Sequence, residues 1–235
     1  MFAAAAFWRM ETIREAAALI FGGDKELWQI IATTLVMSIF STGISALLGI
    51  PLGVLIGKNR FPGKSLLLRL TNTLMGLPPV LAGLIVFILF RSIGPFGWLH
   101  LMFTVPVMVI AQVLLITPVI TGLSAAAAEE RAAQLSETAM GLGVPRRRQT
   151  LLLLRECAGQ FVSVTLMGFG RSIAEVGAVS LVGGNIQFKT RVMTTAILLE
   201  TNKGDFSKAL ALGVILMTLA LLVNVPAYSL REKLK

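Results

Sequence analysis

Charged residues are scarce in this chain of 235 residues. Asp, Glu, Lys and Arg make up 14% of the sequence, whereas hydrophobic residues make up 55% and the mean hydropathy is +0.82. Soluble domains carry about 25% charged residues, and several apolar runs of spanning length need burial on every side, which a bilayer provides. The composition therefore predicts a protein embedded in a lipid bilayer.

Residues that usually carry chemistry are also few. One cysteine, Cys157, rules out an intramolecular disulfide framework, and one histidine, His100, argues against a metal site built from histidines. The two aspartates, Asp24 and Asp205, lie outside the apolar runs. No paired-Asp, Ser/His or HExxH arrangement for an intramembrane hydrolase exists. We therefore predict no catalytic residues and no metal site, and we expect Cys157 and His100 to be packing residues.

The net charge of +9 does not predict a nucleic-acid partner. The basic residues are spread thinly between apolar runs, and the single Tyr leaves no alternation of basic and aromatic residues. Membrane topology explains the charge better.

Apolar runs of spanning length predict an all-α membrane protein with five transmembrane helices, each near or above the ~20 residues required. The predicted spans are 28–57, 70–93, 98–123, 161–182 and 209–230. Before them, residues 1–27 form a separate segment, in which apolar residues recur at helical spacing among charges that break any signal-peptide core. We expect a short amphipathic helix at the membrane interface there, followed by one transmembrane domain over 28–235.

Orientation follows from the distribution of Lys and Arg. Twelve of them lie in 58–69, 124–160 and the C-terminus, against eight on the other side, including Arg91 at the end of the span 70–93. The positive-inside rule then places the N-terminus outside and the C-terminus in the cytoplasm, in a multi-pass protein of the cytoplasmic (inner) membrane.

The largest predicted cytoplasmic segment, about 124–160, contains a polar stretch between apolar helices. Glu137 supports a helix start after Ser136, Gly143 allows a sharp reversal, and Pro145 suits the first turn of the next helix. The pattern predicts helix, tight turn and helix, held near the membrane by the apolar run 151–154, and it favours a docking surface. The alternative is an anchor for anionic lipids formed by the three arginines at 146–148.

The stretch Glu137-Thr138-Ala139, followed three residues later by Gly143, resembles the EAA loop of ABC importer permeases. Residues 74–84 (LMGLPPVLAGL), 170–186 (GRSIAEVGAVSLVGGNI) and 199–217 (LETNKGDFSKALALGVILM) look like the permeases of molybdate, tungstate and sulfate importers, most closely the tungstate branch. Two positions depart from the family pattern: Thr138 replaces an alanine, and Arg155-Glu156 replaces a Leu-Pro pair.

This resemblance implies a type I ABC importer permease fold with a cytoplasmic coupling-helix loop. The implied ATPase-coupling residues are Glu137, Thr138, Ala139, Gly143, Val144, Pro145, Arg146 and Arg147. The implied partners are a cytoplasmic ABC ATPase dimer, an extracytoplasmic tungstate-binding protein and a second copy of the chain. The number of helices also favours a dimer. Five helices in one chain are too few to surround a path for an oxyanion, whereas a two-fold dimer can place the path on its axis.

No cofactor is expected in this chain, since ATP and Mg would be bound by the partner ATPase. Gly63-Lys64-Ser65 looks like the end of a P-loop, but the first required glycine falls on Lys58 and no strand precedes it. We interpret it as a cytoplasmic turn.

Small residues form a stripe along the first span, at Ser41, Ser45, Gly49, Gly53 and Gly57. Such a stripe lets another helix approach closely, and close packing is the favoured interpretation. The alternative is that its hydroxyl end, extended by Thr34 and Ser38, lines the transport pathway.

Two further features are candidates for the pathway or gate. Arg171 and Glu175 are ionisable residues within a predicted span at i,i+4, which predicts an ion pair that fixes the helix or an arginine that meets the anion. Pro78 and Pro79, flanked by Gly76 and Gly83, predict a bend bordering the pathway.

The cargo stays open among tungstate, molybdate and sulfate, which are all tetrahedral dianions. A proton-coupled secondary anion transporter is the other function considered, although Glu175 is the one candidate relay carboxylate in a predicted span.

Overall fold

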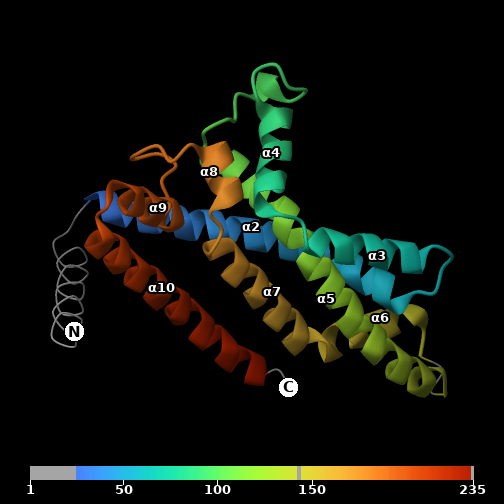
Figure 1. Ribbon diagram of the computed structural model, residues 1–235. Helices are drawn as coiled ribbons and strands as arrows, with labels where there is room; N and C mark the ends of the chain where they lie inside the picture. The colour runs from blue at the N-terminus through green and yellow to red at the C-terminus, as the bar shows by residue number, and fades with distance from the viewer. Residues whose placement is uncertain (1–24, 142–143, 234–235) are drawn as a thin grey trace. The chain divides into compact units, whose positions relative to one another are not determined.

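The computed structural model describes residues 25–141 and 144–233, and every regular element in these ranges is a helix. Figure 1 follows the helices from blue to red along the chain. The predicted all-α fold is confirmed for the described residues, whereas the predicted amphipathic helix falls on residues 1–24, outside them. The elements are α2 (Lys25–Lys58), α3 (Lys64–Met75), α4 (Pro79–Phe90), the 3-10 helix η1 (Gly97–Leu99), α5 (Val105–Gly141), α6 (Arg146–Glu156), α7 (Ala158–Ile173), α8 (Gly177–Gly183), α9 (Met193–Lys203) and α10 (Phe206–Lys233).

Three single helices in the described part are long and apolar enough to cross a membrane, namely α2, α5 and α10. Two broken pairs, α3 with α4 and α6 with α7, meet the same test when each pair is taken as one span. The number of spans is five, as predicted, when both pairs cross, but the second pair begins in α6, within the predicted cytoplasmic segment 124–160, instead of covering the predicted span 161–182. Each pair is two helices separated by a short break, whereas one continuous helix was predicted for each span.

The predicted span over 70–93 is broken. Helix α3 ends at Met75, the Gly76 N–H bonds back to the Thr73 carbonyl at 3.1 Å, and α4 starts at Pro79. Two successive prolines supply no backbone N–H to continue the helical bonding, so the bend predicted at Pro78 and Pro79 is a full interruption.

The predicted span over 98–123 starts later, at Val105. Residues before it form η1 and turns, in which His100 and Phe103 have positive φ values of 50° and 58°. His100 is exposed there, so the expectation that it is a packing residue is wrong. At its other end α5 continues to Gly141, a total of 37 residues. That length corresponds to about 55 Å, whereas the hydrocarbon core is ~30 Å thick. The last turns of α5 therefore extend beyond the bilayer core. The prediction that a new helix starts after Ser136 is wrong, because α5 continues through this residue.

The predicted span over 161–182 is two helices, because α7 ends at Ile173 and α8 begins at Gly177. The Ala178 N–H in the first turn of α8 donates to Glu175 Oε1 at 3.1 Å. A carboxylate in this position satisfies an otherwise unpaired N–H at a helix start. The premise that Arg171 and Glu175 share one helix face is therefore wrong.

The chain divides into two compact units. Unit 1 contains the described residues up to Ile39, Pro79–Gln112 and Ile173–Val223. Its core joins the first turns of α2 to α9 and α10, through Leu27, Ile30, Met193, Ala196 and Leu212 with their neighbours. In the same unit α4 packs closely on α8, since a Cβ at Gly83 would lie 2.7 Å from the Ala178 Cα.

Unit 2 contains Phe40–Pro78, Val113–Ser172 and the described residues from Asn224 onward. It holds the second half of α2, α3, most of α5, α6 and nearly all of α7. Its core cluster consists of Val54, Ala128, Leu153, Cys157 and Phe161, which come from α2, α5, α6, the α6–α7 junction and α7.

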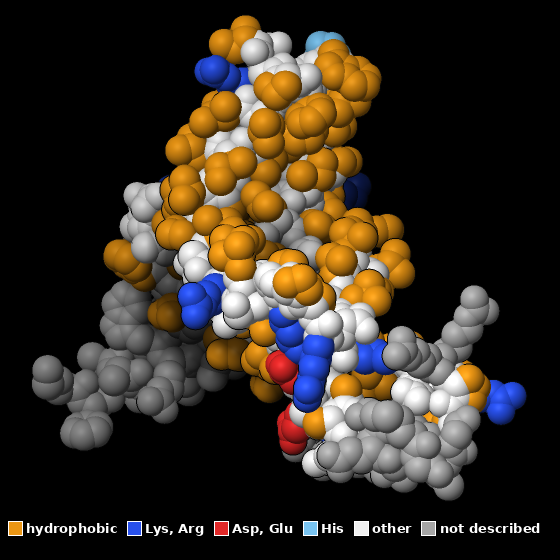
Figure 2. Space-filling view, turned by 90° about the vertical axis from the view of Figure 1, so that its right-hand side faces the viewer, with side chains coloured by type: hydrophobic (Ala, Val, Ile, Leu, Met, Phe, Trp, Pro, Cys, Tyr) orange, Lys and Arg blue, Asp and Glu red, His pale blue; other side chains and the backbone are white. Residues whose placement is uncertain are grey.

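Large apolar side chains are exposed along the spanning helices. Leu47 on α2 is 75% exposed and Leu222 on α10 is 65% exposed. Figure 2 shows hydrophobic side chains over much of the face that it draws, with charged side chains in small groups. Such surfaces are stable in contact with lipid rather than water.

Candidate functional site

The proposed ATPase-docking segment, residues 137–147, has a helix on each side of a break. Helix α5 ends at Gly141 and α6 begins at Arg146, directly after Pro145. The Pro145 carbonyl accepts from the Arg148 N–H at 2.9 Å, and the Val144 carbonyl accepts from Gln149 Nε2 at 2.8 Å. A helix therefore lies on each side as predicted, with Pro145 preceding the second helix instead of lying in its first turn, whereas the predicted tight turn at Gly143 falls outside the described residues.

Several predicted docking residues fall outside what the structure describes. Gly143 lies outside the described residues, and so do the side chains of Glu137, Thr138, Ala139, Arg146 and Arg147. Their coupling roles stay predictions.

Helix α6 is anchored by one of its four consecutive leucines. Leu153 is buried in the unit 2 core, whereas Leu151, Leu152 and Leu154 are exposed. Cys157 is buried beside Leu153 and its thiol donates to the Ala127 carbonyl at 3.8 Å, which confirms it as a packing residue. These contacts fix α6 on α5 within unit 2.

Two lysines for which the sequence predicted no contact make specific contacts near this segment. Lys64 Nζ lies 2.9 Å from Glu129 Oε1 on α5, and Lys58 Nζ donates to Thr150 Oγ1 on α6. Lys64 and Ser65 are the first two residues of α3, and only Gly63 lies in the turn before it, so the predicted turn is confirmed for Gly63 alone. Nothing local in the sequence pointed to Glu129 or Thr150.

The small-residue stripe of α2 packs against α5. A Cβ added at Gly53 would lie 2.6 Å from the Thr121 carbonyl oxygen, and one at Gly57 would lie 2.4 Å from the Ala125 carbonyl oxygen. Backbone this close leaves no room for a side chain, so the packing interpretation is confirmed for the glycines.

The hydroxyl end of the stripe is buried and hydrogen-bonded. Ser41 Oγ lies 2.9 Å from Ser172 Oγ on α7, and Thr117 Oγ1 of α5 donates to Ser45 Oγ at 3.2 Å. Ser38 is also fully buried on α2. These bonds tie α2 to α5 and α7, and their place on a pathway stays a prediction.

Arg171 and Glu175 each have a partner at a helix end. Arg171 Nη1 donates to the carbonyl of Met75, the last residue of α3, at 3.4 Å. Within unit 1, the Glu175 carboxylate accepts from Ala178 and its backbone carbonyl accepts from Thr194 Oγ1 at 2.8 Å. A cation at a helix C-terminus and a carboxylate at an N-terminus both match the helix dipole.

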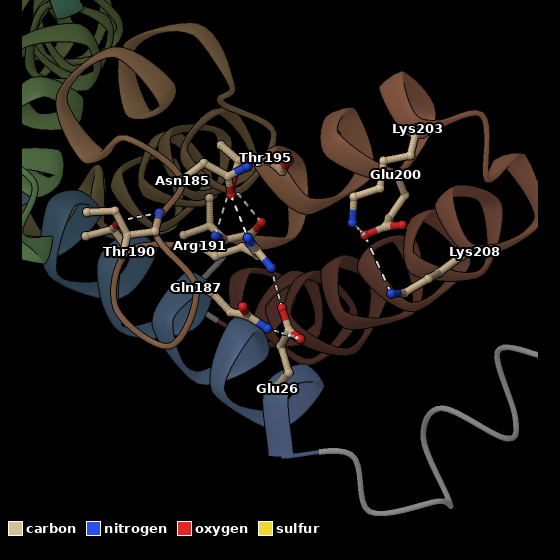
Figure 3. Close-up of polar contacts among 11 residues, drawn as sticks. Glu26, Asn185, Gln187, Thr190, Arg191, Thr195, Glu200, Lys203 and Lys208 are labelled. Carbon is tan, nitrogen blue, oxygen red and sulfur yellow. Dashed lines mark hydrogen bonds and ion pairs between the residues drawn. The ribbon is translucent and has the colours of Figure 1, made fainter.

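A polar cluster joins the start of α2 to the loop before α9 in unit 1 (Figure 3). Glu26 accepts from Arg191 Nη1 through Oε1 and from Gln187 Nε2 through Oε2 at 2.7 Å. Arg191 Nε also donates to Asn185 Oδ1 at 3.3 Å. The loop is therefore fastened to α2 through both oxygens of one carboxylate.

Glu200 on α9 holds two further lysines of this unit. Its Oε1 lies 2.9 Å from Lys203 Nζ and 3.5 Å from Lys208 Nζ, and the residue is only 6% exposed. With Glu26 and Arg191, Glu200 and Lys208 line a small cleft that has room for about one water molecule. The charges of Arg191, Lys203 and Lys208 are thus compensated, whereas Lys189 is exposed.

Apolar helices and broken pairs that together reach spanning length define a multi-pass helical membrane protein. Residues 49–235 match the family model described as the binding-protein-dependent transport system inner membrane component, so the chain belongs to this family and has the type I ABC importer permease fold.

Relatives match nearly the whole chain. The chain is 35% identical to the tungstate uptake system permease protein TupB of Peptoclostridium acidaminophilum, over 95% of this chain and 98% of that protein. It is 36% identical to a probable anion ABC transporter permease of Haloferax volcanii, over 90% and 94% of the two chains. It is 33% identical to TupB of Campylobacter jejuni, over 93% and 92%.

Proposed function

We propose that this chain is the permease subunit of an ATP-driven importer that carries tungstate across the cytoplasmic membrane. The observation that carries the proposal is the 35% identity to a tungstate permease over 95% of this chain and 98% of that one. A second tungstate permease at 33% identity supports the same cargo. Molybdate or sulfate is the alternative cargo, supported by a sulfate permease of Synechococcus elongatus at 30% identity over 73% of this chain.

The chain works with three partners in this proposal: a dimer of cytoplasmic ABC ATPases, an extracytoplasmic tungstate-binding protein and a second copy of itself. ATP and Mg are bound by the ATPases, and the chain itself hydrolyses nothing. Segment 137–147 docks on the ATPase, because it combines a break between two helices with a position beyond the apolar part of α5.

The proposed orientation puts the N-terminus outside and the C-terminus in the cytoplasm. Contacts within unit 2 support grouping segments 58–69 and 124–160 on one side, since Lys64 pairs with Glu129 and Lys58 donates to Thr150. The basic residues of these segments then face the cytoplasm.

Transport proceeds by alternating access. ATP binding draws the ATPases together, the docking segments follow, and the helices open to the outside; hydrolysis resets them inward. The candidate pathway or gate residues are of three kinds: buried hydroxyl residues of α2, residues at a helix break and a residue at a helix end. They are Ser38, Ser41, Ser45, Pro78, Pro79, Glu175 and Arg171.

Uptake of trace tungstate by cells with and without the chain tests the proposal. We expect deletion to abolish uptake, unlabelled tungstate to compete best, and an uncoupler to have no effect while ATP is maintained. Lost molybdate or sulfate uptake with unchanged tungstate uptake would replace the cargo. Collapse on uncoupling at constant ATP would favour a proton-coupled transporter instead.

A further inference from the structure

The turn between α2 and α3 carries a lysine at each end. Lys58 is the last residue of α2 and Lys64 is the first residue of α3. Gly63, just before Lys64, has a φ of 92°, which a side chain would strain. The turn is therefore tight, and it determines the positions of the Lys58 and Lys64 backbones at the ends of the two helices.

Each lysine contacts a different flank of the docking segment. Lys64 Nζ pairs with Glu129 Oε1 at 2.9 Å on α5, and α5 continues without a break from there to Gly141. Lys58 Nζ donates to Thr150 Oγ1, which lies near the start of α6. The helix entering the docking segment and the helix leaving it are thus both joined to one turn.

Lys64 is better placed than Lys58 to carry movement between helices. Its Nζ also donates to the Gly57 carbonyl at 3.0 Å, one of the last carbonyls of α2. One ammonium group therefore contacts the end of α2 and the side of α5 while it belongs to α3. The Lys64 side chain is 15% exposed, so this position is largely enclosed by the helices that it joins.

The small-residue stripe, which ends at Gly57, packs α2 against α5. The hydrogen bond from Lys64 to the Gly57 carbonyl joins the first turn of α3 to the same pair of helices. We propose that Lys64, paired with Glu129, is a positioning residue that transmits movement of the docking segment to α2 and α3. This inference rests on the proposed function. It predicts that loss of the pair uncouples ATP hydrolysis from transport while the ATPase still binds.

The test uses the complete importer, with permease, ATPase and binding protein, reconstituted into vesicles. The variants are Lys64→Glu, Glu129→Lys, the double exchange, and Lys64→Arg. Arg69→Glu is the matched control, because Arg69 is an exposed residue of α3 and the change in charge is the same. The measurements are co-purified ATPase, ATP hydrolysed, and tungstate accumulated inside the vesicles.

We expect each single reversal to lower tungstate transported per ATP by roughly twofold to fivefold, because changes along a coupling network have modest effects and a pair in which the Glu129 side chain is 54% exposed is weak. Lys64→Arg should restore most of this ratio, because it keeps a cation that can reach both partners. The double exchange should restore it in part, because it restores the pair with α5 but places an acceptor beside the Gly57 carbonyl. Arg69→Glu should leave the ratio unchanged. Co-purified ATPase should stay at the wild-type level throughout. Rescue by the double exchange excludes a general effect on folding or topology, because it restores the pair and the net charge.

An unchanged ratio in both single variants would overturn the inference, as would a double exchange no better than the singles. Either result, obtained with a wild-type importer that transports tungstate on ATP, leaves the proposed function intact. A wild-type chain that binds no ATPase would overturn the proposed function and this inference together.

Discussion

Arg171, in the last turn of α7, donates to the carbonyl of Met75 at the end of α3, with 3.4 Å between Nη1 and the oxygen. This carbonyl lies directly before the break at Gly76, where the helical bonding of α3 ends. A guanidinium at this position compensates the negative end of the helix and satisfies an oxygen that has no helical partner. The bond explains how unit 2 tolerates an arginine within an apolar run.

We expect Arg171→Met to lower the free energy of unfolding by about 1–3 kcal/mol, because the carbonyl loses a charged donor. Arg171→Lys should lower it less. Thermal unfolding of the purified permease in detergent measures both effects. If the residue is structural, tungstate uptake per folded Arg171→Lys molecule equals that of the wild type; a large loss of uptake at normal stability would instead indicate contact with the anion.

The glycine stripe makes a second prediction. We expect Gly53→Ala to lower the free energy of unfolding by about 1–3 kcal/mol, because its Cβ would lie 2.6 Å from the Thr121 carbonyl oxygen and from the Ser124 Cβ. Gly43 on the same helix has no atom within 4 Å of such a Cβ. Gly43→Ala is therefore the matched control and should be neutral or slightly stabilising, since alanine favours helix. Equal effects in thermal unfolding would contradict close packing of α2 on α5.

The sequence predicted the long helices well, because their signals are local and strong. Helix α2 spans Lys25–Lys58 where 28–57 was predicted, and α6 begins directly after Pro145. The glycine stripe also predicted the close approach of another helix, although not that the helix is α5. Continuous apolar character and helical spacing are sufficient for such predictions.

The break between α7 and α8 could not be predicted in the same way. The apolar run continues through the break, so the sequence placed Glu175 within a continuous span. Its role depends on two contacts: the Ala178 N–H three residues later and the Thr194 hydroxyl 19 residues later. Tertiary contacts of this kind leave no periodic signal in one sequence.

Lys64 shows the same limit for the candidate site. Its neighbours Gly63 and Ser65 suggested only an imperfect phosphate-binding loop. Its partner Glu129 is 65 residues away and is one of several charged residues at the end of α5. A single sequence does not identify which of these a lysine contacts, so the pair emerged only from the folded chain.

The docking segment gives a third prediction, which rests on its sequence because Gly143 lies outside the described residues. We expect Gly143→Val to abolish tungstate uptake and ATPase co-purification, since a β-branched side chain opposes the sharp reversal. Membrane insertion should be unchanged. Gly170→Val is the control, because a Cβ at Gly170 meets no atom within 4 Å. Normal uptake by Gly143→Val would contradict the docking role.

The Glu26–Arg191 pair gives a fourth prediction. Both side chains are partly enclosed, with 26% and 15% of their surfaces exposed. We expect Arg191→Met to lower the free energy of unfolding by about 1–3 kcal/mol, because Glu26 loses the cation that balances its charge. Lys189→Met is the control, since Lys189 lies in the same loop and is exposed.

A double-mutant cycle with Glu26→Gln separates this interaction from general effects on the loop. Residues in direct contact show coupling energies of about 0.5–3 kcal/mol, so the double variant should cost less than the sum of the single variants. Thermal unfolding at low and high salt adds a second criterion, because salt screens enclosed pairs much less than exposed ones. If the losses in free energy of unfolding are additive and become smaller at high salt, Glu26 and Arg191 interact mainly through solvent. The apolar contacts of Leu27 and Ile30 with α9 and α10 would then hold this end of α2 in place.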